Sequence, residues 1–306
     1  MSNNMSIADK EADLKPAGTA LKDGKAEFIN FLREAKKATS TIIAYAKDLD
    51  QLIEFLAGKK ITQAVNVDSQ MIEEFKESLA NLKYTQKTIS RKLNAIKSFF
   101  KFLVQTGKLD KDPAAAVAHP EVIQKPPRIL SPLEYRALRD AARDDARMET
   151  IIELMLQTGI RIGEVSRMTL NDVDLTKNEM VIRAFESQLE RTVPLNETAK
   201  KSLVRYLEER GSNGKTAAVF ITKTGRPLLV RNIRSAIDRY FGVAGVEGAK
   251  VNDLRHTFIV HQLRNGVSLT RVAELVGHRR VSTTERYLEM IDGGEAKEKK
   301  AEPEEL

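Results

Sequence analysis

Proline is concentrated in one short stretch of this chain, and that stretch divides the sequence in two. Five of the nine prolines lie between Pro113 and Pro132. Because proline lacks a backbone donor and holds the chain extended, such a run is typical of an interdomain linker. A length of 306 residues also suits two domains. We therefore predict a linker over 112–130, a first domain at 25–111, a second at 131–291, a flexible N-terminal arm at 1–24 and a charged tail at 292–306.

Apolar residues recur at helical spacing throughout the first domain. The apolar stripes begin at Phe28, at Ile42, at Ile72 and at Ile89, and the helix that carries the last of them is predicted from about Gln86 to Gln105. A spacing of three to four residues places such side chains on one face of a helix. The first domain is therefore predicted to consist of four helices, without an internal repeat.

The second domain mixes element types. Ser131, Pro132 and Glu134 together predict a capped helix start, because serine can cap, proline suits the first turn and glutamate completes a capping box. Met180–Ala184 and Arg191–Leu195 are predicted to form a β-hairpin. The expected fold class is therefore mostly α with a small β-sheet (α+β). Helices are predicted at 148–157, from near Arg161, and at 197–209, 230–241, 253–265, 268–276 and 282–291.

The composition excludes several classes of protein. There is no cysteine, which rules out disulfides, thiolate zinc sites and a cysteine nucleophile. His256 and His261 are five residues apart, a poor spacing for two metal ligands on one helix, and no glycine-rich phosphate loop is seen. No apolar run approaches the roughly 18 residues of a membrane helix. We expect a cytoplasmic, nucleoid-associated protein with no metal, no cofactor and no membrane contact.

A basic segment in the first domain predicts contact with nucleic acid. The net charge is +7, and no acidic residue occurs between Ser78 and Leu109. Basic side chains four residues apart in this segment stack on one helix face. Either this face is simply solvated, or it lies along a DNA backbone and releases counterions from the phosphates. The predicted DNA contacts are Lys83, Lys87, Arg91, Lys92, Lys97 and Lys101.

Four residues of the second domain form a set that suits phosphoryl transfer: Arg161, Arg255, His278 and Tyr287. Two arginines can grip the non-bridging oxygens of a phosphorane-like transition state with their planar forks. An imidazole can donate a further hydrogen bond or move a proton. A tyrosine hydroxyl can attack phosphorus and hold the DNA end covalently. Because the bond energy is kept in that link, rejoining requires neither ATP nor a metal ion.

Local signals place two members of this set. Gly277 is predicted to end a helix, so that His278 emerges at a turn. Ser282 and Glu285 are predicted to form a capping box that begins the helix of Tyr287. The histidine and the tyrosine are then separated by one turn and a short stretch of helix.

Each of these residues alone has an ordinary structural explanation. Arg161 and Glu164 could form a surface ion pair, and Arg255 a structural salt bridge. A single histidine such as His278 is more often a hydrogen-bonded turn residue, and Tyr287 alone is more often an edge residue of a core. Their occurrence together favours catalysis.

The surrounding motifs resemble those of the tyrosine recombinase/integrase family. Thr158–Glu164, Leu254–Phe258, Leu275–His278 and Ser282–Tyr287 follow its order and usual spacing, and the similarity extends over roughly 25–291. The first domain resembles the family's SAM-like helical core-binding domain, and the proportions are similar to Xer-type site-specific recombinases.

This resemblance implies a C-shaped clamp on double-stranded DNA and a 3′-phosphotyrosyl intermediate. It further implies a monomer in solution that assembles as a tetramer on two DNA sites, with or without a partner recombinase.

Two positions depart from the family pattern. The family usually has histidine three residues before the second arginine, where this chain has Asn252. Asparagine can donate a hydrogen bond to phosphate but cannot shuttle a proton, and we keep it in the predicted site. The family also has a lysine in the hairpin turn that protonates the leaving 5′ oxygen. The matching position falls near Glu186, and the candidate substitutes are Lys223 in a later loop and Arg183.

Three readings follow from these departures. The chain is either a recombinase with an altered acid, a catalytically impaired DNA-binding or architectural relative, or a type IB-like topoisomerase. Retention of both arginines, the histidine and the tyrosine favours the first.

Overall fold

The computed structural model describes residues 19–123, 125–211 and 216–291. The chain divides into two compact units, Met1–Gln124 and Lys125–Leu306, and the division falls within the predicted linker. Most of the predicted arm at 1–24 and the tail at 292–306 lie outside the described residues. Within the arm, however, the first helix already begins at Leu21. No helix in the described ranges is long and apolar enough to cross a membrane.

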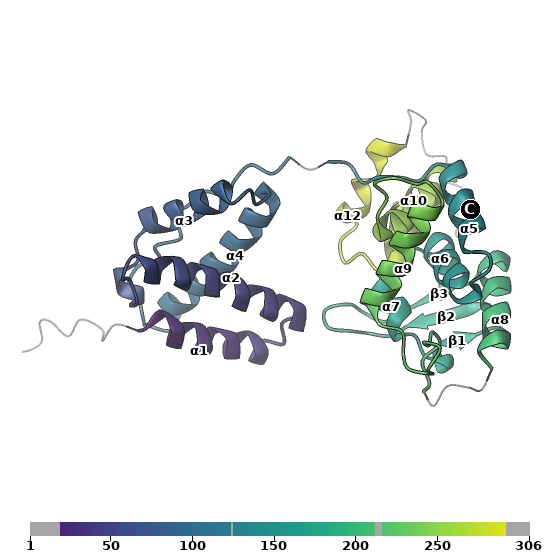
Figure 1. The fold of residues 1–306 in the computed structure, drawn as a ribbon, viewed down its shortest axis with the longest axis horizontal. Helices are drawn as coiled ribbons and strands as arrows, with labels where there is room; N and C mark the ends of the chain where they lie inside the picture. The colour runs from purple at the N-terminus through teal and green to yellow at the C-terminus, as the bar shows by residue number, and fades with distance from the viewer. Residues whose placement is uncertain (1–18, 124, 212–215, 292–306) are drawn as a thin grey trace, which may run out of the picture. The chain divides into compact units, whose positions relative to one another are not determined.

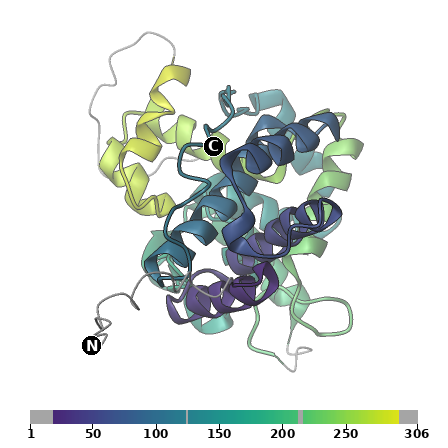
Figure 2. The same cartoon turned by 90° about the vertical axis from the view of Figure 1, so that its left-hand side faces the viewer.

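The first unit is built from helices, as the apolar periodicity predicts. Asp68 and Thr85 each cap the helix that follows by accepting a hydrogen bond from a backbone N–H three residues on. In Figure 1 the first two helices run beside each other and the fourth crosses them, and Figure 2 shows the same unit from its side. The helices are α1 (Leu21–Glu34), α2 (Thr39–Gly58), α3 (Ser69–Asn81) and α4 (Gln86–Gln105).

Aromatic side chains fill the interior of the first unit. The rings of Phe28 and Phe99 meet edge to face at 5.7 Å, and Phe28 also lies 5.5 Å from the ring of Phe102. Phe28, Phe99 and Phe100 are fully buried. Burial of each such side chain stabilises the fold by about 1.5–3 kcal/mol, so these contacts hold α1 against α4.

The second unit combines helices with a small antiparallel sheet in the order β1-β2-β3 (Figure 1). Met180 pairs with Val193 across the hairpin, and both side chains enter the core. Its elements are α5 (Pro132–Ala142), α6 (Ala146–Thr158), α7 (Ile162–Arg167), β1 (Val173–Asp174), β2 (Glu179–Ile182), β3 (Arg191–Pro194), α8 (Glu197–Arg210), α9 (Val230–Val243), α10 (Val251–Arg264), α11 (Leu269–Val276) and α12 (Ser282–Glu285).

Helix α6 is the centre of the second unit. Every residue from Ile151 to Thr158 is buried, and the helix is in contact with α5, α8, α9 and α10. The helix also ends inside the protein, because Gly159 and Ile160 are buried. Gly159 ends it with a left-handed φ of +63°, a conformation that favours glycine. A Cβ at Gly159 would lie 2.4 Å from the Phe258 ring, so glycine also allows the close approach of α10.

Two local predictions for the second unit are confirmed, and two for the segment around Tyr287 are wrong. Ser131 and Glu134 form the predicted capping box of α5, and Gly277 ends α11 with φ +66°. The helix predicted over 282–291 is instead broken. Helix α12 is only four residues long, and a 3₁₀ turn, Leu288–Met290, follows Tyr287.

The predicted capping box of Ser282 and Glu285 does not form. The N-cap residue is Val281, and no side chain caps this helix. Thr284, one residue before Glu285, is fully buried and hydrogen-bonds the His278 ring. The buried side chain of Thr284 therefore holds this turn, and no capping side chain does so.

Candidate active site

The C-terminal end of α11 gathers the two predicted arginines. Arg161 donates from Nη1 to the carbonyl of Val276 (3.1 Å) and from Nη2 to that of Gly277 (2.8 Å). Arg255 donates from Nη2 to the same Val276 carbonyl (2.6 Å) and from Nη1 to the Gly159 carbonyl. Carbonyls at a helix C-terminus lack intrahelical donors and bear partial negative charge, so guanidinium groups are favoured there. Both forks are thereby held side by side.

Glu164 is the buried carboxylate of this group. Its oxygens accept from the Arg161 side chain (2.9 Å) and the Arg161 backbone N–H (2.8 Å). They also accept from both terminal nitrogens of Arg191, at 3.0 and 2.7 Å. Burial opposes the ionised form, but hydrogen bonds and charge from Arg191 and Arg161 outweigh it, and the pKa of Glu164 is lowered. The ion pair predicted between Arg161 and Glu164 is present, but inside the site rather than on the surface.

Positive charge exceeds negative charge at the end of α11. Among the described residues, Arg161 and Arg191 form ion pairs with the Glu164 carboxylate, and the nearby Arg255 guanidinium feels its charge without pairing with it. Burial and then repulsion by Arg161 lower the pKa of Arg255 to about 9. The Arg161 side chain is 29% exposed, whereas Arg255 as a residue is only 6% exposed. An anion such as a phosphate would relieve this repulsion, and Arg161 is the more accessible of the two.

His278 follows directly on the glycine that ends α11. Its Nδ1 lies 2.9 Å from the hydroxyl of Thr284, which orients the ring. Burial, together with the positive charges of Arg255 and Arg161, lowers the pKa of His278 to about 3. The ring is therefore neutral at physiological pH in the protein without DNA.

The lowered pKa of His278 predicts a pH-dependent stability. The unfolded ring titrates near 6.5, so below that pH the unfolded chain binds a proton that the folded chain does not. Stability conferred by neutral His278 is present above pH 6.5 and is lost as the pH falls toward 3, with a slope of at most about 1.4 kcal/mol per pH unit. We expect the free energy of unfolding of His278→Asn, measured with urea at pH 7 and pH 5, to fall less than that of the wild type. Equal falls in the two proteins would contradict this assignment.

Tyr287 packs against two imidazole rings. Its ring lies 6.4 Å from that of His278, nearly parallel at 18°, and 5.9 Å from that of His256. Burial raises the pKa of Tyr287, with Arg255 acting in the opposite direction. The hydroxyl is therefore protonated at neutral pH and must be activated in the reaction. The contacts thus bring Arg161, Arg255, His278 and Tyr287 together, as the motifs predict.

His256 belongs beside this group, although no sequence argument singled it out. Its ring contacts Tyr287, and its Nδ1 is buried 3.4 Å from the Asp253 carboxylate without a hydrogen bond. Its position directly after Arg255 was the available signal. Asn252 is exposed and lies one helical turn before Arg255 and His256 on α10, which places it on the same side of that helix.

The hairpin turn between β2 and β3 contains no lysine. Glu186, at the position of the expected lysine, has a left-handed φ of +52°. The guanidinium of Arg167 lies 3.7 Å from the ring centre of neighbouring Phe185. Arg183 pairs with Asp172 at 2.7 Å, so this arginine is held by a carboxylate.

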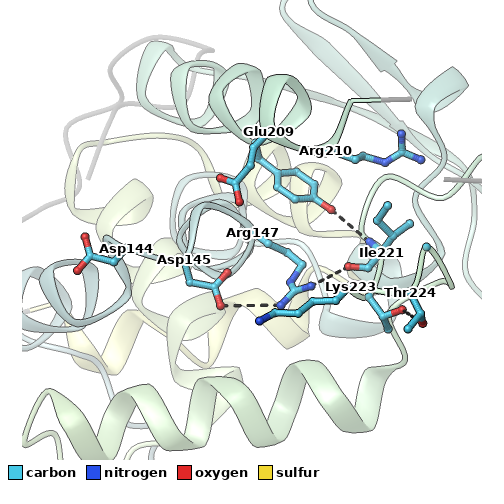
Figure 3. Close-up of a pocket in the computed structure, with 11 residues that line it drawn as sticks. Asp144, Asp145, Arg147, Glu209, Arg210, Ile221, Lys223 and Thr224 are labelled. Atoms are coloured by element: carbon cyan, nitrogen blue, oxygen red, sulfur yellow. Dashed lines mark hydrogen bonds and ion pairs between the residues drawn. The ribbon is translucent and has the colours of Figure 1, made fainter. Parts of the chain in front are cut away.

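Lys223 lies in a different part of the second unit. It lines a pocket of about 690 Å³ that contains none of the four residues around α11. Figure 3 shows the Lys223 side chain alongside Arg147, which donates to the Ile221 carbonyl at 2.9 Å and faces Asp145. The structure therefore does not bring Lys223 to the site for which the sequence suggested it.

Lys223→Ala tests this placement. We expect the rate of DNA cleavage to stay within about threefold of the wild type, because the side chain faces another pocket. The measurement is single-turnover cleavage at saturating DNA. A fall of a hundredfold or more in the cleavage rate would show instead that Lys223 protonates the leaving 5′ oxygen.

One predicted DNA contact on α4 is wrong. Lys92 is buried, and its Nζ donates to the Asp48 carboxylate at 2.8 Å and lies 5.2 Å from the centre of the Tyr84 ring. Only 6% of its side chain is exposed, so it faces inward from the helix. Arg91 also pairs with Asp48, yet its side chain remains 47% exposed.

The other predicted contacts on this segment differ in accessibility. Lys97 is partly buried and donates to the Ala115 carbonyl at 3.1 Å. Lys83, Lys87 and Lys101 are exposed.

The fold and the site together define a DNA strand transferase of the integrase type. The model described as "Phage integrase family" matches residues 128–292, and "Phage integrase, N-terminal SAM-like domain" matches 26–107. The chain is 32% identical over 265 residues to tyrosine recombinase XerC of Roseiflexus castenholzii, covering 83% of this chain and 84% of that protein. It is 30% identical over 272 residues to tyrosine recombinase XerD of Staphylococcus epidermidis, covering 85% and 92%. The chain belongs to the phage integrase family, that is, to the tyrosine recombinases, enzymes that cut and rejoin DNA strands.

Solved structures show the same fold. A lambda integrase dimer bound to a COC′ core site has a TM-score of 0.73 and 14% identity, covering 88% of this chain and 77% of that one. The Tn1549 transposon integrase in complex with transposon right end DNA has a TM-score of 0.76 and 16% identity, covering 88% and 94%.

Proposed function

We propose that this protein is a site-specific DNA recombinase that works through a 3′-phosphotyrosyl link on Tyr287. The observation that supports this most strongly is the cluster at the end of α11. There Arg161 and Arg255 share the Val276 carbonyl, beside a neutral His278 whose ring faces that of Tyr287. The excess positive charge of this cluster suits a phosphodiester, and the tyrosine supplies an oxygen nucleophile.

The chemistry balances within these residues and the DNA. The Tyr287 hydroxyl gives up its proton as its oxygen forms a bond to phosphorus, the bond from phosphorus to the 5′ oxygen breaks, and the 5′ oxygen takes up a proton, so that no proton is gained or lost overall. Arg161 and Arg255 stabilise the negative charge that builds on the non-bridging oxygens. Asn252 and His278 add hydrogen bonds to the phosphate. A 5′-hydroxyl from another strand then attacks the phosphotyrosine and completes the exchange.

The first unit holds the DNA in this proposal. The exposed side chains of Lys83, Lys87, Arg91 and Lys101 neutralise phosphates without reading sequence. We infer a monomer in solution and four protomers on two DNA sites. A lambda integrase tetramer bound to a Holliday junction, with a TM-score of 0.73, has the same protomer fold and supports this assembly.

A plasmid with two copies of a site selected by binding tests the function. In EDTA and without ATP, the recombinase converts the plasmid into two smaller circles or inverts the segment between the sites. Relaxed topoisomers of unchanged sequence would show a topoisomerase instead. Tight binding without any product would show an architectural protein. The absence of a lysine from the hairpin turn would then explain the loss of cleavage. A plasmid with one site, incubated in parallel, separates intramolecular recombination from relaxation.

A further inference from the structure

Arg191 links three elements of the second unit. It lies at the start of β3, directly after the hairpin turn. Its Nε donates to the Leu275 carbonyl near the end of α11 (2.7 Å), while both terminal nitrogens bind the Glu164 carboxylate of α7 (3.0 and 2.7 Å). A bidentate pair of this kind fixes both distance and orientation. The hairpin strand, α7 and α11 therefore meet on one guanidinium.

The position of Arg191 depends on Gly277. A Cβ at that glycine would lie 2.8 Å from Nη1 of Arg191 and 3.0 Å from its Cζ. Glycine at this position therefore serves two purposes, since it adopts the left-handed φ of +66° and leaves room for the guanidinium. His278 is the next residue, so the arginine packs against the turn that presents the histidine.

Arg191 differs from Arg161, the more accessible of the two arginines placed in the reaction. Its side chain is only 10% exposed, and all three of its nitrogens donate to protein atoms. Arg161, by comparison, is 29% exposed and shares one oxygen of Glu164 with Arg191. Removal of Arg191 would leave Glu164 paired with Arg161 alone and the Leu275 carbonyl without this donor. Arg161 would then be drawn toward the carboxylate and away from a bound phosphate.

We propose that Arg191 is a positioning residue. It fixes the position of the Arg161 guanidinium through Glu164, and it fixes the position of His278 through the end of α11. This inference rests on the proposed phosphotyrosine function. It makes the hairpin strand part of the catalytic framework, although the hairpin turn contains no lysine.

Arg191→Met and Arg191→Lys in the full-length chain test the proposal. A nicked DNA site that traps the covalent adduct gives the cleavage rate at saturating DNA, and a titration gives the dissociation constant. We expect Arg191→Met to slow cleavage by about 10- to 100-fold, the size of effect that a displacement of about 1 Å produces, with the dissociation constant within about threefold. Arg191→Lys retains a donor for Glu164 and is expected to recover a large part of the lost rate.

Arg205→Met is the matched control. Arg205 also pairs with a carboxylate, that of Glu149, and donates to a backbone carbonyl, that of Arg143. It lies on α8 and contacts neither α7, α11 nor the hairpin strand through these bonds. The Arg205→Met variant should cleave at the wild-type rate. Arg191→Met that binds DNA normally and cleaves as fast as the wild type would overturn the inference alone. An Arg191→Lys variant that cleaves no faster than Arg191→Met would also overturn it. General misfolding is recognised separately, because it lowers DNA binding and cleavage together. A wild-type protein that forms no adduct would overturn the proposed function and this inference with it.

Discussion

Tyr287→Phe is expected to abolish the covalent protein–DNA adduct and every recombinant product. In the proposed mechanism this substitution removes the oxygen that attacks phosphorus, and it keeps the ring that packs against His256 and His278. Cleavage should fall by at least about 10⁴-fold, because no other group can take over the role of a covalent nucleophile. DNA affinity should remain within about twofold, since phosphate contacts determine binding.

Tyr135→Phe is a suitable control for this change. Tyr135 is another largely buried tyrosine of the second unit, on α5, and contacts the guanidinium of Arg139. Its phenylalanine variant should cleave normally. Adduct formation by Tyr287→Phe at a measurable fraction of the wild-type rate would show that a different residue attacks the DNA.

Replacing either site arginine by lysine is expected to have the second-largest effect. Lysine keeps the charge but loses the planar fork, so it cannot hold the Val276 carbonyl with one nitrogen and present a second nitrogen to a phosphate oxygen at a fixed angle. We expect Arg161→Lys and Arg255→Lys each to lower the cleavage rate at saturating DNA by about 10²- to 10³-fold. The measurement is single-turnover adduct formation on a nicked site.

The two arginine variants should differ in DNA binding. Arg161 is the more exposed, so its replacement should also raise the dissociation constant for DNA by several fold. Arg255 is almost fully buried, and its variant should affect the rate alone. A lysine variant at either position that cleaves within about threefold of the wild type would contradict the placement of that arginine on the transition state.

Local signals in the sequence predicted the framework of the site well. Helix α6 could be predicted from its apolar run around Ile151–Leu156, and the end of α11 from Gly277, because a helix C-terminus favours a left-handed residue. The four motif residues do come together. Each of these predictions depends on residues close together in the chain or on motif order.

The errors and omissions concern side-chain contacts that local patterns do not show. Lys92 belongs to a basic run, but the carboxylate that draws it inward, Asp48, is on another helix. Glu164 and Arg191 are 27 residues apart, and nothing in the local pattern reveals that they pair. Thr284 holds the turn before Tyr287 through the His278 ring, which a capping rule cannot detect. Tertiary contacts of this kind override local preference.

Mapping the attachment site of a trapped adduct tests the central claim most directly. The wild-type protein is incubated in EDTA with a nicked DNA site chosen by binding selection, and the adduct is digested and sequenced by mass spectrometry. The account predicts a nucleotide attached through a 3′ phosphate to the hydroxyl of Tyr287. An adduct on any other residue, or tight binding with no adduct at all, would contradict it.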